Sequence, residues 1–367
     1  MNRKIYMDYA ATSPLREDII AALPELANRY HNASSVGELS AQNRRDIEAV
    51  RRMIARVINA DPEEIIFTSG SSESNSLAID GFLNANKNNY YRVIASNIEH
   101  KSILNNPNVT GHIKCNNSGQ LLPNQFEGYS NTLFCVMHAN NEIGTINPIK
   151  EIAEVVHKHN NYLLVDATQS FTKVPIDVKD MGIDMLSASG HKIGSLKNVG
   201  FLYVSKNVKV SPIIYGTQEM SRRGGTYNHM GIVSFGMAID CSLREDKEYI
   251  ADLRNRLMVK LLDVDENIII NGCLSGRLQN NLNICVRNIN IDAQQLIGML
   301  DEAGFIVSAG SACSSGNPEP SYVLKAIGLS DEDCLHSIRI TLGVENTEEE
   351  IDSFVECLKS IIDMYRD

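Results

Sequence analysis

Polar side chains stand directly after several apolar runs of this sequence, at points where a strand would end. The first such segment, Thr68-Ser-Gly-Ser-Ser-Glu-Ser-Asn75, places Ser71 and Ser72 at the start of a helical pattern. Backbone N–H groups at the start of a helix, with hydroxyls beside them, suit a phosphate group. A plain serine cap is the commoner use of such a segment, so the phosphate interpretation depends on companion residues.

A carboxylate and an amine follow two further apolar runs. Asp166 ends the run Leu163-Leu-Val-Asp166, where it could hold a ring nitrogen protonated or simply cap the next helix. Lys192 ends the segment Ser187-Ala-Ser-Gly-His-Lys192. A lysine at a partly desolvated strand end has a lowered pKa and can form a Schiff base, although most lysines are simply exposed.

His100 and the pair Asn140-Asn141 also follow strand patterns and should reach the same edge of the sheet. His100 could stack on a flat cofactor or move protons. A lone histidine is more often a surface or capping residue, so this signal too is weak by itself.

Cys313 differs from the other cysteines because it lies in a run of small residues, Val307-Ser-Ala-Gly-Ser-Ala-Cys313. Exposed thiols in loops are typical of reactive cysteines. We expect residues 308–317 to be mobile, because Ser, Gly and Ala bury too little apolar area to offset the entropy of ordering. Packing or surface roles are expected for the cysteines at positions 115, 135, 241, 273, 285, 334 and 357.

Together these residues could supply a phosphate cup, a partner for a pyridinium nitrogen, a Schiff-base lysine, a stacking histidine and a thiol. That set is typical of an enzyme that uses pyridoxal 5'-phosphate (PLP).

The sheet that would bring these strand ends together is indicated between about residues 45 and 205. There, short runs rich in Val, Ile and Leu alternate with helical patterns such as Pro148–Asn160. This alternation predicts an α/β fold with a mainly parallel sheet, in which ligands bind at the carboxyl ends of the strands. The expected strands are Glu64–Thr68, Tyr91–Ser96, Thr132–His138, Tyr162–Asp166, Met185–Ser187 and Gly200–Ser205.

A smaller α+β domain is expected after a charged linking helix, Asp246–Leu262. Its terminal helix, Thr347–Met364, opens with a capping-box pattern. The other elements expected there are strands at Asn267–Ile270, Asn281–Val286 and Phe305–Ser308, and a helix at Tyr322–Leu329.

The composition is that of an ordinary globular protein, with 367 residues, 43% of them apolar and 22% charged. The net charge of −11 argues against nucleic acid or an anionic membrane as a direct partner. No run of ~18 apolar residues and no signal-peptide pattern is present, so we expect a cytoplasmic protein with reduced thiols. The absence of a C-x-x-C pair leads us to expect no metal site.

The chain closely resembles the cysteine desulfurases of the NifS/IscS type, which are class V, fold-type I PLP enzymes. The resemblance runs in order over nearly the whole chain. It is carried by Met7-Asp-Tyr-Ala-Ala-Thr12, Thr68-Ser-Gly-Ser-Ser-Glu-Ser-Asn75, Glu99-His-Lys101, His138-Ala-Asn-Asn-Glu-Ile-Gly144, Val165-Asp-Ala-Thr-Gln169, Ser189-Gly-His-Lys192, Gly225-Thr226, Gly310-Ser-Ala-Cys313 and Ser337-Ile-Arg-Ile-Thr-Leu-Gly343.

The resemblance implies a role for each matching residue. Lys192 would form the Schiff base with PLP, Asp166 would pair with the pyridine nitrogen, and His100 would stack on the ring. The other implied contacts are Gln169 and Asn141 near the ring oxygen; Ser71, Ser72, Ser189 and His191 at the phosphate, with Thr226 from the second subunit of a homodimer; and Arg339 and Asn32 at the substrate carboxylate.

The implied reaction converts L-cysteine to L-alanine and leaves the sulfur on Cys313 as a persulfide, with Lys192 or His100 moving protons. A protein acceptor would then take the sulfur, for iron–sulfur cluster assembly, a thio-cofactor or tRNA thiolation. The resemblance also implies a large PLP-binding domain at 15–245 and a small domain, carrying Cys313, at 1–14 and 246–367.

The sequence departs from the family pattern at the expected substrate entrance. Asn32-Ala-Ser-Ser-Val-Gly37 lacks a Pro and a His, Ser195-Leu-Lys-Asn198 replaces Gly-Pro-Lys-Gly, and Gln218-Glu-Met220 replaces Gln-Glu-Arg. The chain ends at Asp367 without the tail with which IscS-type members engage a cluster scaffold, so a standard scaffold partner is not expected.

Two alternatives remain open at this stage. A class V aminotransferase or a selenocysteine lyase would share the fold and the lysine, although a transaminase needs no thiol at Cys313. A thiol-based sulfur carrier or metal-binding protein without catalysis would need neither Asp166 nor Arg339.

Overall fold

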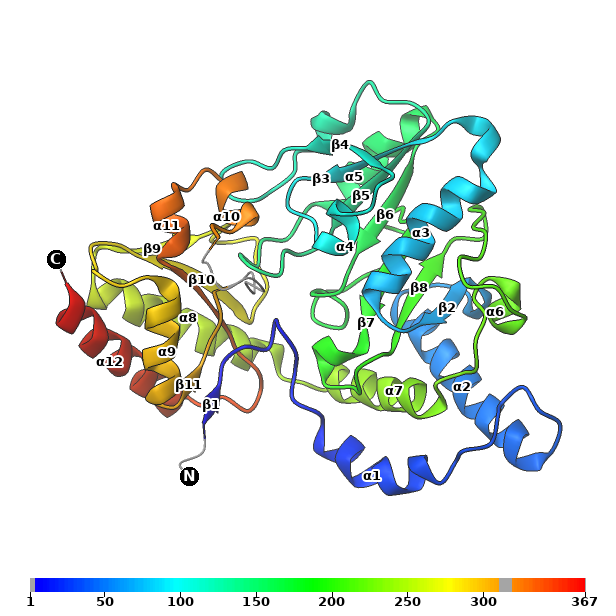
Figure 1. The fold of residues 1–367 in the computed structure, drawn as a ribbon, viewed down its shortest axis with the longest axis horizontal. Helices are drawn as coiled ribbons and strands as arrows, with labels where there is room; N and C mark the ends of the chain where they lie inside the picture. The colour runs from blue at the N-terminus through cyan, green and yellow to red at the C-terminus, as the bar shows by residue number, and fades with distance from the viewer. Residues whose placement is uncertain (1–3, 310–318, 367) are drawn as a thin grey trace.

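The computed structural model describes residues 4–309 and 319–366 and contains a large sheet, a smaller one and a pair of two-residue strands (Figure 1). The large sheet has seven strands in the order β2-β8-β7-β6-β5-β3-β4. All of its strands run parallel except β8, which is antiparallel to both of its neighbours. The strands are β2 (Ile65–Thr68), β3 (Arg92–Ser96), β4 (Val109–Ile113), β5 (Thr132–Met137), β6 (Tyr162–Asp166), β7 (Met185–Ser189) and β8 (Gly200–Val204).

The expected mainly parallel sheet is therefore confirmed. All six strands expected for it are present, and β7 extends two residues further than expected, to Ser189. The edge strand β4 was not expected, because its alternating sequence Val-Thr-Gly-His-Ile contains a glycine and is buried at one residue only.

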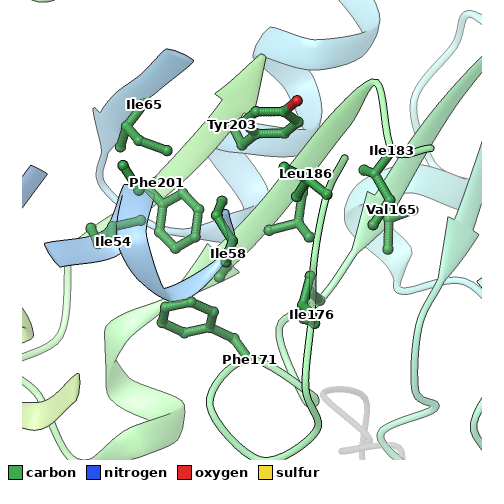
Figure 2. Packing of buried hydrophobic residues seen from close by; sticks show 14 of the residues in the cluster. Ile54, Ile58, Ile65, Val165, Phe171, Ile176, Ile183, Leu186, Phe201 and Tyr203 are labelled. Carbon is green, nitrogen blue, oxygen red and sulfur yellow. The ribbon is translucent and has the colours of Figure 1, made fainter. Parts of the chain in front are cut away.

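The central strands β5 to β8 are buried along nearly their whole length because helices cover both faces of the sheet. Alternate residues of β6 belong to different cores: Leu163 and Val165 pack on the side of α2 and α7, whereas Leu164 packs on the side of α3. Figure 2 shows Ile54 of α2 and Ile58, the residue directly after α2, gathered with apolar residues of the sheet in the first of these cores. The helices of this part are α1 (Glu17–Ala27), α2 (Glu38–Val57), α3 (Ser71–Ala85), α4 (Lys101–Leu104), α5 (Ile149–Val156), α6 (Gln218–Ser221) and α7 (His229–Leu243), with 3₁₀ turns η1 (Pro62–Glu64), η2 (Lys87–Asn89), η3 (Pro123–Phe126), η4 (His157–His159) and η5 (Gly190–Ile193).

The smaller sheet is antiparallel and has the order β12-β10-β9. The linking helix begins at Lys247 and ends at Val264, close to the expected bounds. At the last helix, Thr347 accepts a hydrogen bond from the backbone N–H of Glu350 and the capping box is formed, as the sequence predicted. The elements of this part are α8 (Lys247–Val264), β9 (Ile268–Asn271), β10 (Asn281–Val286), α9 (Ala293–Glu302), β11 (Phe305–Ile306), α10 (Tyr322–Ala326), α11 (Asp331–Leu335), β12 (Ser337–Thr341) and α12 (Glu348–Tyr365).

The N-terminal segment belongs to the small sheet's side of the molecule, which Figure 1 shows. Strand β1 (Ile5–Tyr6) pairs in parallel with β11, and Met7 lies in the apolar core formed by α8, α9 and α12. That core draws on residues before 8 and after 249, whereas the α2–α7 core draws on residues between 15 and 239. The predicted domain bounds, 15–245 for the large domain and 1–14 plus 246–367 for the small one, remain a prediction. The division of the cores agrees with them.

Candidate active site

A cavity of about 490 Å³ lies at the carboxyl ends of the parallel strands. It also receives residues from β12 and from the segment after β1, so both sheets contribute to its wall. The predicted site residues that line it are Ser71, Ser72, His100, Asn141, Asp166, Gln169, His191, Lys192 and Arg339. These side chains are far apart in the sequence, and the fold brings them to one place as a parallel sheet requires.

Lys192 lies in η5, immediately after β7, and its amine faces the cavity. Its Nζ donates hydrogen bonds to the carbonyl oxygens of Ala10 at 2.7 Å and Ala11 at 2.8 Å. Burial, together with the positive charges of Arg339 and Lys173, lowers the pKa of Lys192 to about 7. The amine is therefore deprotonated in a large fraction of molecules near neutral pH, as a nucleophilic lysine requires.

Asp166 ends β6 and is buried, with both carboxylate oxygens held by donors. Oδ1 accepts a hydrogen bond from the backbone N–H of Thr168 at 2.9 Å, and Oδ2 accepts one from Nδ2 of Asn75 at 3.0 Å. These bonds fix the plane of a carboxylate that lines the cavity, so it can receive a protonated ring nitrogen.

The start of α3 forms a tight turn against β7 and β8. Gly70 has a φ of 148°, and a Cβ placed on it would lie 3.4 Å from Oγ of Ser189. Gly200 packs so closely that a Cβ there would lie 2.7 Å from Cα of Gly70. The first N–H groups of this 15-residue helix and the hydroxyls of Ser71 and Ser72 make this wall of the cavity suitable for a phosphate.

Two histidines line the cavity, and both are held neutral. Burial lowers the pKa of His191 to about 4, with the charges of Lys192 and Lys197 acting in the same direction. Burial also lowers the pKa of His100, partly offset by the negative charge of Asp166.

Arg339 lies on β12 and is almost completely buried. Its Nη2 donates to Oδ1 of Asp8 at 2.6 Å, and its Nη1 donates to the carbonyl oxygen of Asn141 at 3.0 Å. Asp8 therefore holds the guanidinium at the cavity wall. No role for Asp8 was predicted from sequence. Asp8 lies in one of the stretches that carry the family resemblance, but no local sequence pattern links it to Arg339.

Buried carboxyl groups that the sequence analysis also missed lie beside the cavity. Glu142 lines it and accepts a hydrogen bond from the hydroxyl of Ser321, and burial raises its pKa. Glu99 is fully buried, accepts the backbone N–H of Met137 at 2.7 Å, and has its pKa raised to about 8 by burial. The sequence signal that could have identified them is their position, because Glu142 directly follows Asn141 and Glu99 directly precedes His100.

Some predicted residues do not line this cavity in the single chain. Ser189 is buried behind the Gly70 turn. Asn32 is exposed in the loop between α1 and α2, where its side chain accepts the backbone N–H of Ser34. Thr226 is exposed and lines a smaller cavity with Gln218 and Asn198.

Cys313 and most of the loop expected at 308–317 lie outside the described residues. Among the described cysteines, Cys135, Cys285 and Cys334 are buried, in agreement with the expected packing role. Cys273 is partly exposed. Burial alone would raise the pKa of its thiol, but backbone N–H groups, including that of Gly276 at 3.3 Å from Sγ, outweigh this effect and lower the pKa.

The described residues contain neither a membrane-spanning helix nor a metal-binding cluster. None of their helices combines the length and the apolar character that crossing a membrane requires. Nor do they contain a group of three or more His, Cys, Asp or Glu side chains arranged to hold a metal ion.

The cavity wall fits a flat, phosphate-bearing aldehyde with a ring nitrogen. A nucleophilic amine, a fixed carboxylate and the start of a helix surround one space. These groups would bind the aldehyde, the ring nitrogen and the phosphate of such a molecule.

The chain is similar to known proteins over nearly its whole length. Residues 5–354 match the model of the class-V aminotransferase family. A cysteine desulfurase IscS of Dictyoglomus turgidum is 37% identical over 383 residues, covering 100% of this chain and 96% of that protein. The solved structure of a NifS-like protein from Rickettsia africae has a TM-score of 0.88 at 30% identity, covering 98% of this chain and 100% of that one. A structure described as SspA in complex with cysteine has a TM-score of 0.81 at 33% identity and covers 93% of this chain and 99% of that one.

Proposed function

The chain belongs to the class-V aminotransferase family, and we propose that it is a PLP-dependent cysteine desulfurase, which converts L-cysteine to L-alanine and passes the sulfur to Cys313. Relatives that cover the whole chain bear that name, and a similar structure was solved with cysteine. The observation that carries the proposal is the convergence of Lys192, Asp166 and Arg339 on one cavity.

The residues that would hold PLP are those of the cavity wall. Lys192 would bind its aldehyde carbon, Asp166 its ring nitrogen, and the start of α3 its phosphate, with His191 and Ser189 nearby. Bound PLP supplies an electron sink for a carbanion at the substrate's Cα.

The chain's own residues bind the substrate and move its protons. Arg339 offers a planar fork to the substrate carboxylate, and Asp8 keeps that fork oriented. With a pKa of about 7, Lys192 can accept a proton from Cα and return it at another carbon. The carbonyl groups of Ala10 and Ala11 hold the amine in place while it carries that proton.

The sulfur step needs a nucleophile, and we assign that role to Cys313. Its thiolate attacks the sulfur of the substrate, so that an S–S bond forms as the Cβ–S bond breaks. The electron pair of the broken bond stays on carbon, which is then protonated to give alanine. The persulfide on Cys313 is the form in which sulfur leaves for a protein acceptor.

A second subunit would complete the PLP-binding site. Thr226 and Asn32 are exposed in the single chain, and we propose that a homodimer brings Thr226 to the phosphate of its partner. The acceptor would serve iron–sulfur cluster assembly, a thio-cofactor pathway or tRNA thiolation. A cytoplasmic location also remains a prediction.

Product analysis tests this function directly. Purified protein given L-cysteine and a thiol reductant should form alanine and sulfide in equal amounts. The same assay with selenocysteine measures its selectivity. Formation of a keto acid in place of alanine would identify an aminotransferase and contradict the proposal.

A further inference from the structure

Three hydrogen bonds join the carboxylate of Asp166 to the ring of His100. Nδ2 of Asn75, on α3, lies 3.0 Å from Oδ2 of Asp166 and 3.0 Å from Oγ of Ser102. The hydroxyl of Ser102, on α4, lies 2.9 Å from Nδ1 of His100. Asn75 and Asp166 are buried, so this chain of bonds crosses the wall of the cavity between three elements.

The charge of Asp166 fixes the orientation of Asn75. A carboxylate can only accept hydrogen bonds, so Asn75 must turn its NH₂ group toward Asp166. The same NH₂ group then donates to Oγ of Ser102 and occupies one of its two lone pairs. The hydroxyl proton of Ser102 remains available to Nδ1 of His100, 2.9 Å away.

The main chain imposes the same state on His100. The backbone N–H of Ser102 lies 3.1 Å from Nδ1 of His100, and a backbone N–H can only donate. Nδ1 therefore faces two donors and carries no proton. In a neutral imidazole the proton is then on Nε2, the nitrogen left to face the cavity that His100 lines.

The surroundings of His100, taken together, favour a neutral ring. Burial lowers the pKa of His100, and Lys192 from η5 and Lys101 from α4 act in the same direction. Asp166 from β6 opposes them with a smaller effect than burial. Protonating Nδ1 would also set its N–H against two donors.

We propose that Asn75 and Ser102 are positioning residues that hold His100 as the neutral Nε2–H tautomer, so that this histidine presents a hydrogen-bond donor to the cavity. The proposed desulfurase function decides only which bound group meets this N–H; the tautomer itself follows from the protein's own bonds. This assigns the movement of protons at Cα to Lys192 rather than to His100, because an Nε2 that carries a proton cannot accept another.

Solid-state ¹⁵N NMR of the holoenzyme, labelled in its histidine rings, tests the tautomer. The His100 signals are identified as those missing from a His100→Gln variant. We expect Nδ1 to resonate as a bare ring nitrogen and Nε2 as an N–H at neutral pH. A protonated Nδ1 would overturn the proposal, whether or not the protein produces alanine.

Variants separate the hydrogen-bond chain from the backbone contact. Ser102→Ala removes the hydroxyl donor, so His100 should be easier to protonate and its pKa should rise by roughly half a unit. Asn75→Leu should act in the same direction, because the Ser102 hydroxyl is then free to turn. Ser102→Thr keeps a hydroxyl and should restore the wild-type value, and Ser76→Ala, a matched change on α3 beside Asn75, should leave it unchanged. An unaltered His100 pKa in Ser102→Ala would remove Ser102 and Asn75 from the proposed role.

Discussion

The surroundings of Lys192 show how single residues tune the site. Its amine is held by two carbonyl oxygens, and a second cavity of about 30 Å³ that touches it is lined also by Lys173, Arg16 and Glu245. Burial lowers the pKa of Lys173 to about 8, so this second lysine is largely protonated at neutral pH and repels a proton on Lys192. The positive charge of Lys173 therefore lies close enough to Lys192 to lower its pKa.

Replacing Lys173 tests this arrangement. Lys173→Met removes a positive charge that lowers the pKa of Lys192, so that pKa should rise above its wild-type value of about 7. At pH 7 the variant should then react more slowly with added PLP, and the difference should vanish at high pH. The measurement is the pH dependence of PLP uptake by protein stripped of cofactor, followed by absorbance. Lys179→Met, at an exposed position, is the control, and a midpoint identical to wild type in Lys173→Met would contradict the account.

Arg339 is the residue that we propose binds the substrate carboxylate. Arg339→Lys keeps the charge but loses the planar fork and its fixed bond to Asp8, so kcat/KM for cysteine should fall ~30-fold, equivalent to ~2 kcal/mol. Bound PLP should keep its absorbance. Arg366→Lys is the matched control, because Arg366 is an exposed arginine that also pairs with carboxylates, those of Asp265 and Asp363. Equal turnover of wild type and Arg339→Lys would refute the role.

The elements that position these residues were largely predictable from sequence. Strands such as β5 and β6 are largely continuous apolar runs, which is the pattern of a sheet covered on both faces; β6 ends in Asp166, and His138 directly follows β5. β1 was not predictable, because Ile5–Tyr6 is two residues long and pairs with β11 some 300 positions away in the sequence. The bonds from Asp8 to Arg339 and from Asn75 to Ser102 also join different elements of the fold. Local sequence spacing therefore could not predict them.

Helix α6 shows an element held in a strained form by a buried ion pair. Three successive residues, Glu219, Met220 and Ser221, have positive φ values of 50°, 55° and 62°. The Glu219 carboxylate accepts bonds from Arg51 at 2.7 and 2.9 Å and from the backbone N–H of Phe67 at 2.9 Å. This pairing ties the turn that leads to Thr226 to α2 and β2.

Breaking that pair should destabilise the fold. Arg51→Met leaves the Glu219 carboxylate buried without its cation, which costs ~3 kcal/mol or more. Urea unfolding followed by far-UV circular dichroism should show the loss, whereas Arg52→Met at the neighbouring exposed position should change little. The double variant Arg51→Met/Glu219→Gln should be more stable than Arg51→Met alone. An Arg51→Met protein as stable as wild type would show that the pair contributes nothing.

At the scale of the whole molecule, several apolar side chains are exposed on the surface of the large sheet's part. Val36 is fully exposed in the loop before α2, and Tyr215 and Met220 are 84% and 57% exposed around α6. Figure 1 places these segments at the right of the molecule, away from the small sheet. Tyr215 and Met220 are close to Thr226 in the sequence, and we propose that the homodimer covers this part of the surface.

Charges placed on that surface test the homodimer. Tyr215→Asp and Val36→Glu should shift the protein from dimer toward monomer in sedimentation velocity and weaken PLP retention, because charged groups would be buried at the interface. Met364→Glu, at an exposed methionine of α12, is the control and should stay dimeric. A wild-type protein that is monomeric and active would contradict the proposed assembly.

The central claim is that sulfur from cysteine passes through Cys313, and mass spectrometry tests it most directly. After addition of L-cysteine, wild-type protein should gain one sulfur atom, and peptide mapping should place it on Cys313. Cys313→Ala should keep the yellow colour of bound PLP but lose nearly all alanine and sulfide production, while Cys273→Ala, which removes a partly exposed thiol of the described residues, should behave as wild type. Sulfur found on Cys273 or another cysteine, or alanine formed by Cys313→Ala at the wild-type rate, would contradict the account.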